Sequence, residues 1–271
     1  MIGETKFYEN IASLKLMAKK EVGQNFLIDP EICRRIAGAL ESKEGDRILE
    51  IGCGPGSLSY ALASVPGDID LIDIDEGMLA KVKNDFEGVA NLHPMYGNAV
   101  KWDYAAYDRI IGNLPYYITS GILERCFLGQ EKAKRMVFMV QKEAAQRLLA
   151  PVGTKEYSPL SVLLALSAKA KRLFSVSRTA FVPAPHVDSS VIAFDLELSA
   201  DKAEIVDAYR LATGLFLQRR KTVLNNLKPR VSSLEKAEQA LSFAGIDPKS
   251  RPEDIKPEQF LLLSRALKRV Q

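Results

Sequence analysis

The sequence predicts an α/β fold in which a doubly wound, mostly parallel sheet is followed by a small all-helical domain. Short apolar segments alternate with amphipathic helical segments as far as residue 149, and this alternation is typical of a parallel sheet covered by helices. After about Ser199 the strand pattern ends and only helical periodicity remains. We therefore expect a first domain over residues 1–199 and a helical domain over residues 200–271.

Capping residues and periodicity place the individual elements. Asp29 followed by Pro30 predicts a helix over 31–42, because Asp caps helix N-termini and Pro suits the first helical position. Strands are predicted over 46–52, 69–75, 108–114, 135–141, 171–176 and 189–198, and helices over 57–64, 78–86, 118–128, 142–149, 158–168, 204–227, 233–245 and 257–269. Residues 95–102 are predicted to form a turn, and the last two strands an antiparallel pair.

Composition excludes several classes of protein. Of 271 residues, 47% are hydrophobic and 26% charged, so a disordered or low-complexity chain is excluded. No apolar run is long enough for a membrane span, and the first residues do not resemble a signal peptide, so we expect a cytoplasmic protein. Three cysteines and two distant histidines predict neither a disulfide framework nor a metal site. His186, Cys53 and Cys126 are interpreted as structural, and the lack of a long apolar face predicts a monomer.

The charge is uneven along the chain. The net charge is only +3, but from Asp201 onward 14 Lys or Arg stand against 9 Asp or Glu. Charge alone indicates no more than solvated helix faces.

A glycine-rich turn between the first of the predicted strands and the helix that follows it indicates a ligand-binding site. In Glu50-Ile-Gly52-Cys-Gly54-Pro-Gly, the glycines allow a tight turn and close approach of the backbone. The spacing matches neither the dinucleotide fingerprint nor a triphosphate loop. Asp73, about 20 residues further on at a strand end, can accept both hydroxyls of a ribose. Asp75 is better explained as a helix N-cap.

A second motif, Asn113-Leu114-Pro115-Tyr116, follows the strand over 108–114. Doubly wound folds bind ligands at the carboxyl ends of their strands. Pro115 is rigid and keeps Leu114 extended, so the Asn113 amide oxygen and the Leu114 carbonyl can point at one spot beside the ring of Tyr116. Two acceptors and a stacking ring suit a planar amine, such as the exocyclic amine of adenine, whose nucleophilicity rises when both of its hydrogens are accepted. Without its neighbours, the motif could equally be a rigid structural turn.

Seven motifs in order resemble the KsgA family of ribosomal RNA adenine dimethyltransferases over about residues 19–270. They are Lys20-EVGQNFLID, LEIGCGPGSL, IDID, GNAVKWD, IGNLPYYITS, FVPAPHVDSSV and FLQRRKTVLNNL. The resemblance implies a Rossmann-like class I methyltransferase domain that binds S-adenosylmethionine and dimethylates N6 of two adjacent adenosines near the 3′ end of small-subunit (16S) RNA, contributing to small-subunit biogenesis.

The resemblance also implies roles for individual residues. The cofactor-binding residues would be Gln24, Asn25, Leu27, Glu50, Gly52, Gly54, Asp73, Ile74, Asn98, Ala99 and Asn113. Asp73 replaces the family's usual glutamate, and Asn98 stands where the family generally has an aspartate. Asn113, Leu114, Pro115 and Tyr116 would form the catalytic turn, and Phe181 the second aromatic wall around the target adenine. No metal is expected.

The other RNA contacts are expected outside the Asn113 turn. Phe181 lies in a rigid aromatic segment, FVPAP, and an unstacked base needs an aromatic surface. Arg219, Arg220 and Lys221 are predicted to lie on one helix, where they can bind phosphates, as can Lys19 and Lys20.

Two alternatives remain open at the level of sequence. An Erm-type enzyme has the same motifs but modifies large-subunit RNA. In a ribosome assembly factor, binding rather than catalysis would matter.

Overall fold

The computed structural model describes residues 25–270, which form two compact units. The first unit contains the described residues up to Ala145 together with Lys171–Leu196, and the second contains Gln146–Ala170 and the residues from Glu197 onward. The chain passes from the first unit to the second between residues 196 and 197, close to the domain boundary that the sequence predicted at residue 199. The segment 146–170, which the sequence pattern assigned to the first domain, groups with the helical unit instead.

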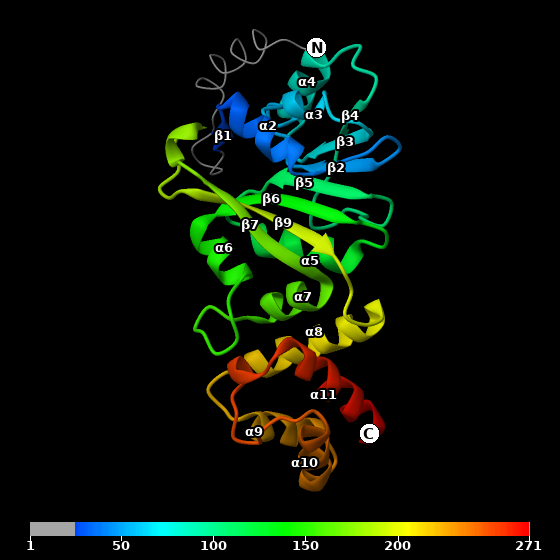
Figure 1. Cartoon of the computed structure of the whole chain (residues 1–271), viewed down its shortest axis with the longest axis vertical. Helices are drawn as coiled ribbons and strands as arrows, with labels where there is room; N and C mark the ends of the chain where they lie inside the picture. Colours follow the sequence, from blue (N-terminus) through cyan, green and yellow to red (C-terminus); the bar gives the residue numbers. More distant parts are fainter. Residues whose placement is uncertain (1–24, 271) are drawn as a thin grey trace. The chain divides into compact units, whose positions relative to one another are not determined.

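A seven-stranded sheet runs in the order β4-β3-β2-β5-β6-β9-β7 (Figure 1). The strands are β1 Phe26–Leu27, β2 Arg47–Ile51, β3 Asp68–Asp73, β4 Leu92–Tyr96, β5 Arg109–Asn113, β6 Arg135–Gln141, β7 Ala168–Val176, β8 Phe181–Val182 and β9 Ser189–Leu196. The neighbouring strands β4, β3, β2, β5 and β6 are parallel to one another, and β9 is antiparallel to β6. The order reverses between β2 and β5, and this reversal confirms the predicted doubly wound arrangement and marks where such folds bind ligands.

The described residues form ten α-helices, most of them where the periodicity predicted a helix. They are α2 Pro30–Gly38, α3 Ser59–Leu62, α4 Glu76–Asp85, α5 Thr119–Gly129, α6 Lys142–Leu148, α7 Pro159–Ser167, α8 Lys202–Phe216, α9 Val223–Leu227, α10 Leu234–Phe243 and α11 Pro257–Val270, with short 3-10 turns η2 Arg178–Ala180, η3 Lys228–Arg230 and η4 Pro252–Asp254. The Asp29 carboxylate accepts hydrogen bonds from the amides of Glu31 and Ile32, which confirms its capping role.

Alternate residues of the central strands face two different cores. On one face, Ile48, Leu71 and other strand side chains pack with buried residues of α2, α3 and α4. On the opposite face, α5 packs against β9, where the rings of Phe127 and Phe194 lie 5.3 Å apart edge to face. Burial on both faces explains why the central strands read as nearly continuous apolar segments.

Two features of the first unit differ from the sequence prediction. Met95 and Tyr96 belong to strand β4, so the turn begins only at Gly97. Pro94 lowers the strand signal there, and it is tolerated because β4 is an edge strand. Strands β1 and β8, which pair with each other, are too short to give a periodic pattern.

The helix predicted over 204–227 is wrong. Helix α8 ends at Phe216, and a turn separates it from α9, where the Thr222 hydroxyl accepts a hydrogen bond from the amide of Asn225 as an N-cap. Arg219 and Arg220 therefore lie in a turn rather than on a helix face. The apolar period continues through this segment and hides the break.

Candidate active site

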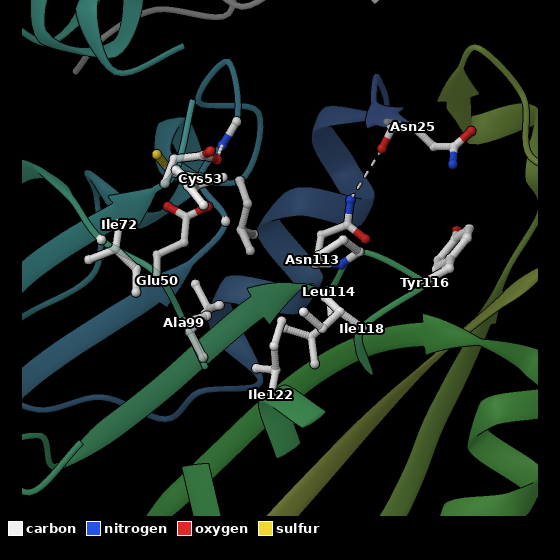
Figure 2. A pocket seen from close by; sticks show the side chains of 18 of the residues that line it. Asn25, Glu50, Cys53, Ile72, Ala99, Asn113, Leu114, Tyr116, Ile118 and Ile122 are labelled. Atoms are coloured by element: carbon white, nitrogen blue, oxygen red, sulfur yellow. Dashed lines mark hydrogen bonds between the residues drawn. The ribbon is translucent and has the colours of Figure 1, made fainter. Parts of the chain in front are cut away.

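A cavity of about 240 Å³ opens in the first unit at the carboxyl ends of the parallel strands (Figure 2). It lies at the point where the strand order reverses between β2 and β5. The predicted residues that line it are Asn25, Leu27, Glu50, Gly52, Gly54, Asp73, Ile74, Asn98, Ala99, Asn113, Leu114, Pro115 and Tyr116. Segments that are distant in sequence thus form one site.

The glycine loop forms one wall of the cavity. Gly52 and Gly54 have φ of 69° and 52°, a region that side chains other than glycine rarely adopt. The amides of Gly52 and Cys53 both donate to the Ile72 carbonyl, at 2.8 and 3.1 Å. The loop is therefore fixed to the end of β3 and presents bare backbone to a ligand.

Asp73 connects this loop to the next strand. One carboxylate oxygen accepts a hydrogen bond from the Gly54 amide at 2.8 Å, and the other accepts from the Asp75 amide at 2.9 Å. Burial raises the pKa of Asp73, while these amides lower it. Asp75 caps α4 through the amides of Gly77 and Met78, as predicted. An acid at this position can still accept from a ribose, because each carboxylate oxygen has two lone pairs.

Glu50 lies deep in the same wall. It is only 1% exposed, and Oε2 accepts a hydrogen bond from the Ser59 hydroxyl at 2.6 Å. Burial raises the pKa of Glu50 to about 8, against the opposing effect of the Ser59 hydrogen bond, and the charge of Asp73 adds to the rise. A cationic group bound in the cavity would stabilise the ionised form of this carboxyl.

The turn after β5 is held on several sides. The Leu114 amide donates to the Met139 carbonyl at 3.1 Å, and the Ile118 amide and the Thr119 hydroxyl both donate to the Pro115 carbonyl. Asn113 Nδ2 donates to the Asn25 carbonyl at 3.4 Å, as the dashed line in Figure 2 marks. This bond uses the amide nitrogen of Asn113 and leaves Oδ1 as the acceptor that a substrate amine needs.

Two polar side chains of the site are engaged internally. The Tyr116 hydroxyl and the Ser189 hydroxyl lie 2.8 Å apart, which fixes the ring at the cavity. Asn98 Oδ1 accepts a hydrogen bond from the Val100 amide at 3.0 Å and shapes the turn after β4. Its Nδ2 remains a donor.

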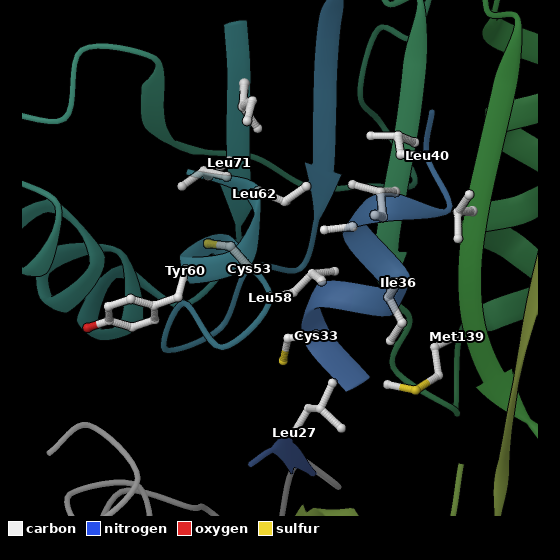
Figure 3. Close-up of a cluster of buried hydrophobic side chains, with 14 of the residues drawn as sticks. Leu27, Cys33, Ile36, Leu40, Cys53, Leu58, Tyr60, Leu62, Leu71 and Met139 are labelled. Atoms are coloured by element: carbon white, nitrogen blue, oxygen red, sulfur yellow. The ribbon is translucent and has the colours of Figure 1, made fainter. Parts of the chain in front are cut away.

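The structure does not place Phe181 on the cavity. Strand β8 pairs Phe181 with Leu27 of β1, and the ring is 2% exposed within the buried cluster that also contains Ile48 and Leu71. A role as the second aromatic wall would require the ring to turn out of this core, and it stays a prediction. Cys53 belongs to the same cluster (Figure 3), where burial raises its thiol pKa, consistent with a structural residue.

The predicted phosphate contacts divide into two groups. Lys19 and Lys20 lie outside the described residues, as does Gln24, which was predicted to bind the cofactor. In the second unit, Arg219 donates to the carbonyls of Thr154 and Lys155 at 2.9 and 2.7 Å, and its Nε lies 3.3 Å from Glu253. Arg220 and Lys221 are exposed. Arg219 is thus bound within the unit.

Sequence reasoning missed part of the cavity lining. The additional residues are Phe26, Ile51, Cys53, Pro55, Ser57, Leu58, Ile72, Gly97, Val100, Tyr117, Ile118 and Ile122. Most are apolar, and an apolar residue gives the same periodic signal whether it faces a core or a cavity. Phe26 could have been found, because it stands between two predicted cofactor residues.

No helix within residues 25–270 is long and apolar enough to cross a membrane. No group of three or more His, Cys, Asp or Glu in the same range could hold a metal ion.

Known proteins resemble this chain over most of its length. The sequence pattern of the ribosomal RNA adenine dimethylase family matches residues 15–269. The ribosomal RNA small subunit methyltransferase A of Malacoplasma penetrans (strain HF-2) is 36% identical over 96% of this chain and 97% of its own length.

Solved structures show the same fold. A dimethyladenosine transferase from Plasmodium falciparum superposes with a TM-score of 0.76 and 28% identity, over 88% of this chain and 95% of the other. The 23S rRNA methyltransferase ErmE superposes with a TM-score of 0.68 over 90% and 99% of the two chains, and at 23% identity it supports the fold alone. With nearly the whole chain matched, the protein belongs to the ribosomal RNA adenine dimethylase family.

Proposed function

We propose that this protein transfers methyl groups from S-adenosylmethionine to N6 of two adjacent adenosines near the 3′ end of small-subunit ribosomal RNA. The observation that carries the proposal is the Asn113 turn, whose amide nitrogen is engaged by Asn25 and whose Oδ1 is left to accept at the cavity. The relative from Malacoplasma penetrans, named as a small-subunit methyltransferase, supports this substrate over large-subunit RNA. The protein would act as a monomer in the cytoplasm.

The residues of the cavity fit this cofactor. Asp73 offers carboxylate oxygens to the ribose, Gly52 and Gly54 allow close approach of the backbone, and Glu50 offers a buried carboxyl to the ammonium of the methionine part. Ile74 and Ala99 supply apolar surface for the adenine ring. When bound, the cofactor supplies an electrophilic methyl group on a sulfonium centre.

The Asn113 turn would act on the target amine. In the first transfer, Oδ1 of Asn113 and the Leu114 carbonyl would accept its two hydrogens, which draws the lone pair out of conjugation with the ring. In the second transfer, one of these two acceptors would hold the single hydrogen that remains on the amine. The ring of Tyr116, held by Ser189, stacks on the base. Positioning and these two acceptors carry the reaction, and the excess proton of the methylated amine passes to water.

Labelled methyl transfer tests the proposal directly. Small subunits that lack these methyl groups, large subunits and DNA are each incubated with the protein and labelled S-adenosylmethionine, and the RNA is digested to nucleosides. We expect N6,N6-dimethyladenosine in the small-subunit RNA only. Label in large-subunit RNA alone would indicate an Erm-type activity, and tight small-subunit binding without label would indicate an assembly factor.

A further inference from the structure

The exposed apolar side chains of the first unit gather at one edge of the sheet. Among its described residues, the large hydrophobic side chains that are exposed are Ile74, Tyr96 and Tyr117, at 57%, 60% and 72%. They follow β3, end β4 and follow β5, so all three lie at the carboxyl edge, where the cavity opens. Ile74 and Tyr117 line the cavity, whereas Tyr96 does not.

Tyr117 differs sharply from the neighbouring tyrosine. The hydroxyl of Tyr116 is paired with Ser189, and burial raises the pKa of Tyr116. The Tyr117 ring stays largely in solvent although the backbone on either side is fixed, through Leu114 before it and Ile118 after it. The turn therefore presents an exposed aromatic ring at the mouth of the cavity, on a backbone that is held on both sides.

We propose that Tyr117 is a positioning residue that stacks on the RNA base next to the adenine in the cavity. The inference rests on the proposed function. A base that enters the cavity leaves its stack, so its neighbour loses one stacking partner and needs a replacement surface. A tyrosine ring supplies that surface to any base, because every base has a π-face. Tyr117 lines the same cavity that would hold the target adenine, so its ring would lie next to that base.

Three variants separate stacking from other effects of the side chain. Tyr117→Ala removes the ring, Tyr117→Phe keeps it without the hydroxyl, and Tyr96→Ala removes an exposed tyrosine at the same sheet edge but off the cavity. We expect Tyr117→Ala to raise KM for small subunits about 5- to 150-fold, the effect of losing one stacked base. Its kcat should change much less, its S-adenosylmethionine Kd should stay unchanged, and the other two variants should behave as wild type.

A fluorescent base shows which nucleotide the ring contacts. Small subunits are reconstituted with 2-aminopurine, which is quenched on stacking, at the target position or at either neighbouring position. Binding should quench the probe at one neighbouring position with wild type and Tyr117→Phe, and this quenching should be lost with Tyr117→Ala. The readout needs RNA binding only, so it stays informative if methyl transfer, the proposed function, fails.

Three outcomes would overturn the assignment. One is a change of quenching at the target position alone, which would make Tyr117 a wall for the target base. The second is equal quenching by wild type and Tyr117→Ala at both neighbouring positions. The third is the same KM loss in Tyr96→Ala, which would show a general effect of the exposed surface.

Discussion

The carboxylate of Asp73 accepts a hydrogen bond from the amide of Gly54 at 2.8 Å, across the glycine loop. An acid that the sequence assigned to a ribose therefore also holds the loop against which the rest of the ligand would lie. This double role has a measurable consequence.

Asp73→Ala should weaken both the fold and the site. Loss of a charged acceptor for two amides should lower the free energy of unfolding by about 1.5–3 kcal/mol. The Kd for S-adenosylmethionine, measured by calorimetry, should rise at least roughly tenfold. The matched control is Asp75→Ala, which removes the α4 cap at a cost of about 1 kcal/mol and should leave the Kd unchanged. Equal Kd changes in both variants would contradict a ribose contact by Asp73.

The buried carboxyl of Glu50 should make stability depend on pH. Its pKa is raised from 4.5 in a solvated glutamate to about 8 in the fold, so the native state binds more protons between these values. Stability should therefore fall as pH rises from about 5 to 8, by on the order of 1 kcal/mol per pH unit at most.

Urea unfolding at several pH values checks the role of Glu50, without methyl donor present. In Glu50→Gln, whose amide oxygen can still accept from Ser59, this slope should disappear, and the variant should be more stable than wild type at pH 8. An identical pH slope in both proteins would show that Glu50 is ionised in the fold.

Asn113→Ala should separate chemistry from cofactor binding. Removing one acceptor of the amine should lower kcat about 10²- to 10³-fold, the effect of one lost transition-state hydrogen bond. The S-adenosylmethionine Kd should stay close to that of wild type. Tyr116→Phe, which loses only the contact with Ser189, serves as the control and should retain most of its activity. An unchanged kcat in Asn113→Ala would contradict the proposed mechanism.

Neighbouring arginines in the second unit should behave differently. Arg219→Ala breaks bonds to Thr154 and Lys155, so the free energy of unfolding should fall by about 1.5–3 kcal/mol. Arg220→Ala should leave stability unchanged but weaken small-subunit binding, and the slope of log K against log salt should become shallower by about 0.7–0.9. Denaturant unfolding and binding titrations at several salt concentrations measure the two effects. A stable Arg219→Ala that loses only RNA binding would restore the role predicted from sequence.

Most of the fold could be predicted because its signals are local. Strand β6 begins and ends at the predicted residues, because a strand that is buried on both faces has a continuous apolar sequence with clear limits. The break after α8 could not be predicted, because the bonds of Arg219 that accompany it reach residues more than 60 positions away. Strands β1 and β8 gain their structure only by pairing with each other.

The sequence by itself determined the glycine loop, the acid after β3, the Asn113 turn and the order of the motifs, because turns and caps depend on nearby residues. Tertiary structure alone decided which atoms of these motifs are left for a ligand. Asn113 Nδ2 donates to a carbonyl 88 positions away, the ring of Phe181 is buried in the core cluster that also contains Leu27, and the ring of Tyr117 is left exposed beside Tyr116. Hydrogen-bond partners and burial depend on segments that meet only in the folded chain, and no local pattern specifies them.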